Sequence, residues 1–512
     1  MDTLLPVAPG IRRHVRGLRL VASLLALLSA APLAFAGNGA DGKVVAPIIA
    51  QIDAGHFEAA DTAITGALAQ PGLGADTRDA LAFQHERMRR ILLDFTLSAD
   101  DVKARVRKPI PDLSEAEFAR WNAAGLFEHQ VIDGRTVYFK RAPSNLFRLS
   151  PEAVARRAVQ TPITDGPMAS LNEHQRAIYQ AALAEHRSSV LPQRLRMTQT
   201  LTVAADAVPA GETVRAWIPY PQAVPGQQED IRYVASVPVQ HRIAPGSAPQ
   251  RTVYLEKLAV AGKKTVFSVT YELTLFAQYH AIDADKVQAA AITPELAPYV
   301  AERAPHIVLT DAMRRFSHEV VGDEKNPYRI AQKLFAAVDR IPWAGAREYS
   351  TIANISDYAL HAGHADCGQQ TLLLMALLRL NGIPARWQSG MVFFGNGSGD
   401  GSRYSNIHDW GYLYLAPYGW VPMDVTTGRL QPGPGDDPAL EWFYLGGLDN
   451  YRIAFNDDFG RRFQPAKRHF RSDDVDSQRG EAEWRGGNVY FDQLDYDFDW
   501  QILPAAQGRS GK

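Results

Sequence analysis

The chain is 512 residues long, more than one ordinary hydrophobic core accommodates, so two to four domains are expected. Hydrophobic residues make up 46% and charged residues 21% of the sequence, which is typical of globular proteins. The formal net charge of −2 supplies no field that would attract a polyanion, so the composition argues against a nucleic-acid partner.

The N-terminus has the composition of a secretory signal peptide. Four arginines between residues 12 and 19 precede an apolar stretch over residues 20–33, and Ala34-Phe35-Ala36 forms a small-residue cleavage site. A membrane anchor is the alternative, but the stretch is short and Pro32 interrupts it. We therefore expect residues 1–36 to be removed and the mature protein to be periplasmic or secreted, with no remaining membrane span.

The next part of the chain, residues 37–195, is predicted to be mainly helical. Apolar side chains recur at helical spacing over residues 44–52, 57–68 and 76–95. A hairpin interrupts this pattern, because Asp133-Gly134 forms a turn signal between β-prone flanks.

Residues 196–280 show strand periodicity. Apolar and polar residues alternate from Phe267 to Leu275, as in a strand with one buried face. Several such segments predict a β-sandwich-like domain. Helical patterns resume after residue 282, where Asn326 is expected to cap a helix that begins with Pro327.

Cys367 is the single cysteine of the chain, which excludes an internal disulfide. The run of residues 371–380 that follows it is almost wholly apolar and predicts a helix buried on every side. The unpaired amides and positive dipole at a helix start favour a thiolate and could stabilise an oxyanion. A buried, inert cysteine is the alternative. We expect a reactive thiol whose pKa is lowered.

His408 and Asp424 are the candidate partners of that thiol. They lie on two strand-like segments that a turn near Pro417 joins. A hairpin centred on Ala416 would place His408 directly opposite Asp424, so that the carboxylate fixes one imidazole nitrogen while the other faces the thiol.

The order of these motifs resembles the core of the transglutaminase-like superfamily over about residues 325–428. Cys367 at a helix start is followed by residues 382–386 (Gly-Ile-Pro-Ala-Arg), by His408-x-Trp410 and by Gly419-Trp420-x-x-x-Asp424. The resemblance implies an α+β, papain-like fold and a Cys-His-Asp catalytic triad carried by Cys367, His408 and Asp424.

The sequence departs from the family pattern at one position, and the resemblance leaves the oxyanion donor undecided between two residues. Asp409 replaces the small residue that commonly follows the histidine, which could tune substrate access. Family members often carry an upstream Trp or Tyr as an oxyanion donor, and Trp343 and Tyr349 are both candidates here.

Two other histidines offer an alternative chemistry. His361 and His364 could compete as the base, or could form a metal site with Asp366, but no second ligand cluster accompanies them. We therefore expect neither a metal nor another cofactor. The loop of residues 395–401 is rich in glycine and is expected to be a mobile rim beside the cleft.

The whole chain is thus divided into a signal peptide (1–36), a mainly helical region with a hairpin (37–195), a β-sandwich-like domain (196–280), a transglutaminase-like catalytic domain (281–430) and an aromatic-rich extension (431–512). The aromatic residues of this extension could line a carbohydrate- or peptide-binding face, although a core position is favoured. They are Trp442, Phe443, Tyr444, Tyr451, Trp484, Tyr490, Phe491, Tyr496 and Trp500.

The sequence therefore predicts an exported, cysteine-dependent acyl-transfer enzyme that acts on peptide or carboxamide carbonyls through a thioester. Its expected partner is a protein or peptide substrate, such as a cell-envelope peptide. Hydrolysis is favoured because water is always present, and an amine acceptor would instead make a cross-linking transglutaminase. A non-catalytic envelope binding or scaffold protein of the same fold is the alternative from another class.

Overall fold

The computed structural model describes residues 40–160, 171–394 and 404–504. The expected signal peptide (1–36) and the expected mobile rim (395–401) lie outside these residues. Within the three described ranges, no helix has the length and hydropathy needed to cross a membrane.

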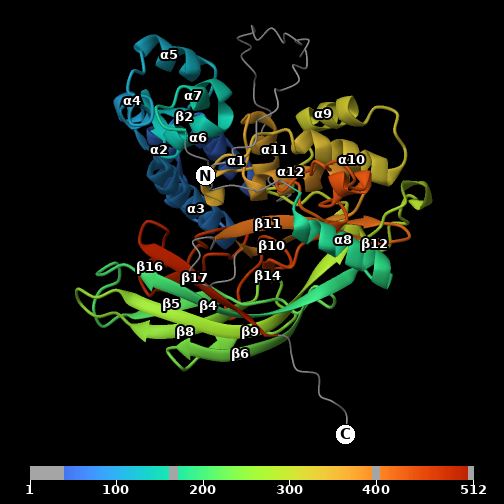
Figure 1. Cartoon of the computed structure of the whole chain (residues 1–512). Helices are drawn as coiled ribbons and strands as arrows, with labels where there is room; N and C mark the ends of the chain where they lie inside the picture. The colour runs from blue at the N-terminus through green and yellow to red at the C-terminus, as the bar shows by residue number, and fades with distance from the viewer. Residues whose placement is uncertain (1–39, 161–170, 395–403, 505–512) are drawn as a thin grey trace, which may run out of the picture.

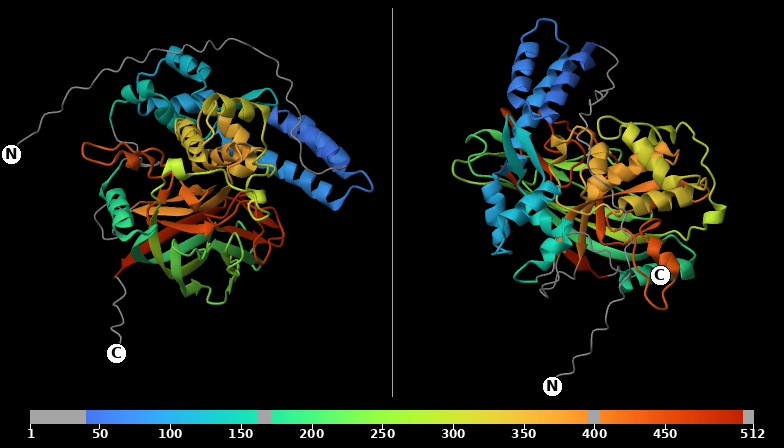
Figure 2. Two further views of the ribbon diagram at one scale, coloured as in Figure 1. Left: turned by 90° about the vertical axis from the view of Figure 1, so that its right-hand side faces the viewer. Right: turned by 90° about the horizontal axis from the view of Figure 1, so that it is seen from above.

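The fold is mixed α and β, which confirms the predicted α+β class. In Figure 1 most helices lie on one side of the sheet that contains β10 and β11, and a larger β-sandwich lies on the other side. The N-terminal helices α1 to α3, in blue, project beyond the rest of the molecule in the two views of Figure 2.

The N-terminal region consists of eight helices and a small sheet within the described residues. The helices are α1 (Ala40–Asp53), α2 (Phe57–Leu68), α3 (Ala75–Asp94), α4 (Ala99–Arg107), α5 (Glu115–Ala123), α6 (Ala142–Leu149), α7 (Pro151–Ala155) and α8 (Glu173–Glu185). The strands are β1 (Phe95–Leu97), β2 (His129–Ile132) and β3 (Arg135–Phe139), in the order β1-β3-β2. The predicted hairpin is confirmed, and its turn residues Asp133 and Gly134 both have positive φ, as a two-residue hairpin turn requires.

Two antiparallel sheets form the sandwich. One has the order β13-β9-β4-β17 with β6 paired to β9, and the other has the order β16-β15-β5-β8-β7. The strands are β4 (Ser189–Val203), β5 (Thr213–Pro219), β6 (Gln228–Val237), β7 (Arg242–Ile243), β8 (Thr252–Leu258), β9 (Thr265–Tyr279), β13 (Gly447–Leu448), β15 (Glu481–Trp484), β16 (Gly487–Val489) and β17 (Leu494–Leu503).

The C-terminal extension is therefore interleaved with the sandwich. Strand β17 pairs with β4 along its whole length, from Leu494 opposite Val203 to Leu503 opposite Arg194. Trp500 and Phe498 are buried in the sandwich core, and Phe443, Tyr444 and Tyr490 are also buried. Burial of these rings supports the interpretation that the aromatic residues of the extension form core and not a binding face. The domain boundaries at residues 195, 280 and 430 remain predictions.

A third, antiparallel sheet with the order β12-β11-β10-β14 positions the region of interest. Its strands are β10 (Ala385–Phe394), β11 (Tyr404–Leu415), β12 (Gly419–Met423) and β14 (Arg452–Asn456), and the helices beside it are α9 (Asp311–Val321), α10 (Pro327–Val338), α11 (Ile355–His361) and α12 (Cys367–Leu380). The cap of α10 is confirmed, since the Asn326 side chain accepts from the amides of Tyr328 and Arg329. The buried helix after the cysteine is also confirmed, because α12 is buried from Cys367 to Arg379.

The hairpin of β11 and β12 differs from the prediction in register. Gly411 pairs with Met423 and Leu415 with Gly419, so the turn is centred on Pro417, not on Ala416. The closing residue, Gly419, has a φ of 80°, a conformation that glycine adopts without steric cost after a three-residue loop. His408 is therefore not directly opposite Asp424.

Candidate active site

Cys367 is the first residue of α12, as predicted. Asp366 caps this helix: its carboxylate accepts from the Gln369 amide at 3.1 Å, and the Gln369 side chain accepts from the Asp366 amide at 3.2 Å. The cysteine itself is 8% exposed. The thiol thus lies at the start of a helix that the core holds rigidly.

His408 and Asp424 do meet, although the register differs from the prediction. His408 Nε2 lies 2.8 Å from Asp424 Oδ2, in a diagonal contact between β11 and the end of β12. The carboxylate also accepts from the Thr427 hydroxyl at 2.8 Å and from Arg452 Nη1 at 3.0 Å. Burial opposes ionisation, but His408 and Arg452 outweigh it and hold the pKa of Asp424 below its usual range.

The thiol has a different partner from the one that the sequence predicted. Cys367 Sγ donates to Asp409 Oδ2 at 3.2 Å, and no hydrogen bond joins Cys367 to His408 among the described residues. Adjacent residues of a strand point to opposite faces of a sheet, so the Asp409 side chain turns toward the thiol and that of His408 turns away. The predicted contact between imidazole and thiol is therefore not formed in this structure.

Asp409 is the neighbour that the sequence reasoning missed. Its Oδ2 also lies 3.2 Å from the Tyr349 hydroxyl oxygen, and its Oδ1 accepts from Gln478 Nε2 at 2.8 Å. Side chains alternate between the two faces of a strand, so the strand pattern of residues 404–415 could have shown that residues 408 and 409 point to opposite faces. The unusual carboxylate after the histidine pointed to the same position.

Burial and carboxylates control protonation at this site. Burial first, and then the charge of Asp366, raise the pKa of Asp409 to about 7, and burial raises the pKa of Asp366 to about 6. Burial, followed by the charges of Asp409 and Asp366, raises the pKa of the Cys367 thiol well above its usual value. The expectation of a lowered thiol pKa is therefore wrong for this state, because these effects outweigh the helix start.

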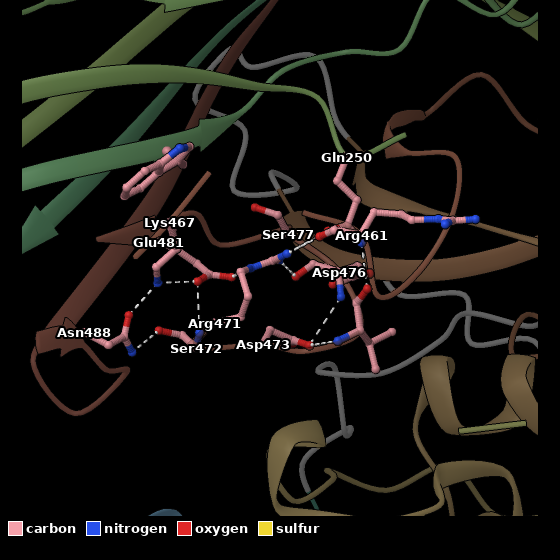
Figure 3. Close-up of polar contacts among 12 residues, drawn as sticks. Gln250, Arg461, Lys467, Arg471, Ser472, Asp473, Asp476, Ser477, Glu481 and Asn488 are labelled. Atoms are coloured by element: carbon pink, nitrogen blue, oxygen red, sulfur yellow. Dashed lines mark hydrogen bonds and ion pairs between the residues drawn. The ribbon is translucent and has the colours of Figure 1, made fainter. Parts of the chain in front are cut away.

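A second buried carboxyl group supports Asp409. Asp476 shares a hydrogen bond with Asp409 and accepts one from the Ser389 hydroxyl. Figure 3 shows the polar contacts that hold its segment: Arg471 Nη2 donates to the Asp476 carbonyl at 2.8 Å and pairs with Glu481. The Asp473 carboxylate accepts from the Asp476 amide at 3.3 Å. This C-terminal segment is thus fixed by charged contacts of its own.

A cavity of about 210 Å³ opens beside Cys367. Trp343 and Tyr349, the two candidate oxyanion donors, both line it. Tyr349 also touches the first turn of α12, because its hydroxyl accepts from the Gly368 amide at 3.1 Å and donates to Asp366 Oδ1 at 2.9 Å. Residues from outside the predicted core complete the wall; they are Arg141, Asp473, Gln478, Arg479 and Tyr496.

The alternative histidines lie elsewhere. His361 is exposed, and its Nδ1 is 2.8 Å from the Asp357 carbonyl. His364 is buried with Nδ1 3.1 Å from the Ala362 carbonyl and Nε2 3.7 Å from Glu128 Oε2. In the ranges that the structure covers, no group of three His, Cys, Asp or Glu residues is arranged to hold a metal ion.

Comparison with known protein families finds a similarity in this region. Residues 314–425 match the model of the transglutaminase-like superfamily. No curated protein matches the chain.

The solved structures that resemble the chain are distant. A candidate cysteine protease from Cytophaga hutchinsonii has 15% identity and a TM-score of 0.41, over 62% of this chain and 93% of that one. The periplasmic domain of TgpA from Pseudomonas aeruginosa has 14% identity and a TM-score of 0.25, over 52% and 95%. At these TM-scores, neither the fold nor the function of these proteins can be assigned to this chain.

Proposed function

We propose that this chain, whose residues 314–425 belong to the transglutaminase-like superfamily, is an exported, cysteine-dependent acyl-transfer enzyme acting on peptide or carboxamide carbonyls. The observation that carries the proposal is Cys367 at the start of a buried helix, beside a cavity, with this helix packed against β11, the strand that carries His408 of a buried His–Asp pair. The thiolate attacks the carbonyl carbon, the amine leaves with a proton, and a thioester on Cys367 remains. Water then hydrolyses the thioester and regenerates the thiol.

In this proposal His408 is the general base and Asp424 orients its imidazole. In the structure the thiol donates to Asp409, and burial raises the pKa of that thiol. His408 lies on the face of β11 opposite to Asp409, so attack requires this strand to rearrange near residue 408 and bring the imidazole to Cys367 Sγ when substrate binds.

Hydrolysis is the favoured outcome, and cross-linking is the alternative within this chemistry. No pocket dedicated to an amine donor is evident in the sequence, and water is always present, which favours water as the acyl acceptor. The signal-peptide pattern supports export, which N-terminal sequencing of the mature protein tests: a start at or near Gly37 supports it, and a start at Met1 refutes it.

A non-catalytic binding or scaffold function is the second candidate. The observation that favours it is the thiol that donates to a carboxylate, together with the absence of a contact from His408 to Cys367 among the described side chains. In such a protein the His408–Asp424 pair would serve stability alone.

Turnover by variants distinguishes the acyl-transfer enzyme from the non-catalytic protein. Cys367→Ala and His408→Ala should each abolish peptide hydrolysis, Asp424→Asn should reduce it less, and the double variant of Cys367 and His408 should be no worse than either single variant. His361→Ala, an exposed histidine, is the matched control. Melting temperatures reveal whether a loss reflects unfolding. Normal turnover of Cys367→Ala refutes the proposal, and loss in His364→Ala with retention in His408→Ala refutes its choice of base.

A further inference from the structure

The N-terminal region contributes a wall to the cavity beside Cys367. Two reciprocal hydrogen bonds fasten α6 to the loop in front of the cysteine: Asn145 Nδ2 donates to the Gly345 carbonyl at 2.9 Å, and the Gly345 amide donates to Asn145 Oδ1 at 3.0 Å. Arg141, the residue that precedes α6, is thereby held at the cavity.

Gly345 leaves room for the Arg141 side chain where it lies. A Cβ added at Gly345 would be 2.4 Å from Arg141 Cζ, so the guanidinium packs against bare backbone at this position. Any side chain at residue 345 would displace it. The Arg141 side chain thus packs on a glycine that is more than two hundred residues away in the sequence.

The other two arginines of the cavity wall are already paired. Arg479 Nη1 lies 3.1 Å from Glu348 Oε1, and Arg347 Nη2 donates to the Thr351 carbonyl at 3.2 Å. Arg141 is exposed, and its guanidinium makes no hydrogen bond or ion pair with any other residue in the described part of the chain. It is the arginine of this wall whose donors are free for a ligand.

The carboxylates nearby accept no hydrogen bond from Arg141 among the described residues, although its charge acts on Asp366 and Glu348. Asp366 Oδ1 accepts from the Gln369 amide and the Tyr349 hydroxyl, and Asp409 accepts from Cys367 and Gln478. A planar guanidinium with free donors matches a carboxylate in two parallel hydrogen bonds.

We propose that Arg141 binds a carboxylate of the substrate next to the carbonyl that Cys367 attacks, so that the enzyme prefers acidic peptides. This inference rests on the proposed acyl-transfer function and names the substrate class for that same site. The carboxylate comes either from an Asp or Glu side chain or from a free C-terminus, and both present the same group to the guanidinium.

The test compares matched peptides with the full mature chain. One pair carries Glu or Gln at each position flanking the cleaved bond, and a second pair ends in a free or an amidated C-terminus. The wild-type protein should have the higher kcat/KM for the carboxylate member of at least one pair. Arg141→Ala should lose that preference, with a fall of about tenfold to a hundredfold for the carboxylate peptide and little change for its neutral partner.

Two further variants make the result specific. Gly345→Ala retains the charge but displaces the guanidinium, so it should lose the same preference. Arg135→Ala removes an exposed arginine of the same region that does not line the cavity, so it should retain the preference.

The outcomes also separate this inference from the proposed function. If no peptide is turned over in a Cys367-dependent way, the proposed function fails and the inference falls with it. If turnover depends on Cys367 but the carboxylate preference is absent, or persists in Arg141→Ala, then the acyl-transfer function stands and the inference is overturned.

Discussion

Two neighbouring residues of β11, on opposite faces of the strand, contact the thiol and the Asp424 carboxylate. Asp409 holds the thiol proton on one face, and His408 contacts Asp424 on the other. The helix start favours a thiolate, but burial and two carboxylates favour the thiol more strongly. The sequence predicted Cys367, His408 and Asp424 as a triad, which stays a prediction; the strand face of His408 and Asp409 was not predicted.

Replacing Asp409 should make Cys367 easier to ionise. Asp409→Asn removes a negative charge 3.2 Å from the sulfur, so the thiol pKa should fall. The rate of iodoacetamide labelling, measured against pH, should show a lower midpoint. Asp424→Asn is the matched control on the other face of the strand and should leave the midpoint in place. A midpoint in Asp409→Asn equal to or higher than that of the wild type would contradict this electrostatic account.

The Asp409 carboxyl group should also make the free energy of unfolding depend on pH. The pKa of Asp409 is raised in the folded state to about 7, so its proton stabilises the fold at low pH and this contribution is lost as pH rises from about 4 to about 7. Asp409→Asn should therefore gain stability relative to the wild type over that interval, by up to roughly 1.4 kcal/mol per pH unit. Urea unfolding at several pH values measures this. A difference between the two proteins that stays constant from pH 4 to pH 7 would show that the group is not buried and protonated as described.

At the scale of elements, local pattern predicted most of the helices and strands correctly. The apolar run after Cys367, the Asn326 cap and the Asp133-Gly134 turn each specify their element through nearby residues, and each is confirmed. The register of β11 and β12 was wrong, because Gly419 sets the turn through a backbone conformation that residue pattern alone does not reveal.

Strand β10 depends on a glycine for its contact with β14. A Cβ added at Gly390 would lie 1.8 Å from the Ile453 carbonyl oxygen, so the two strands would have to separate. Gly390→Ala should lower the free energy of unfolding by about 1–3 kcal/mol. Gly246→Ala, where a Cβ would meet no atom within 4 Å, is the control and should change it little. Equal stability of the two variants in chemical denaturation would count against the close approach.

At the scale of the whole molecule, segments from both ends of the chain build the surroundings of Cys367. Arg141 comes from the N-terminal region, and Asp473, Gln478 and Arg479 come from the C-terminal extension. Such contacts connect residues separated by more than a hundred positions, and no periodicity in the sequence reports them. This is why the cavity wall, unlike the central helix and strands, was not predicted.

The interleaving of the C-terminal strands predicts that the extension is required for folding. A chain truncated after Gly480 loses β15 to β17, which leaves the β4 edge unpaired and removes Phe498 and Trp500 from the sandwich core. It should be insoluble or should unfold without a cooperative transition, as measured by circular dichroism. A truncated chain that melted within a few degrees of the full chain would show that the extension is a separate unit.

The central claim is that Cys367 forms a thioester with a peptide carbonyl. Intact-protein mass spectrometry tests it most directly, after the mature protein is incubated with a periplasmic extract or an acidic peptide and quenched in acid. We predict an added acyl mass that maps to Cys367, is lost on treatment with hydroxylamine and does not form on Cys367→Ala. The same adduct on the wild type and on Cys367→Ala, or no adduct on a wild-type protein that hydrolyses the peptide, would contradict the account.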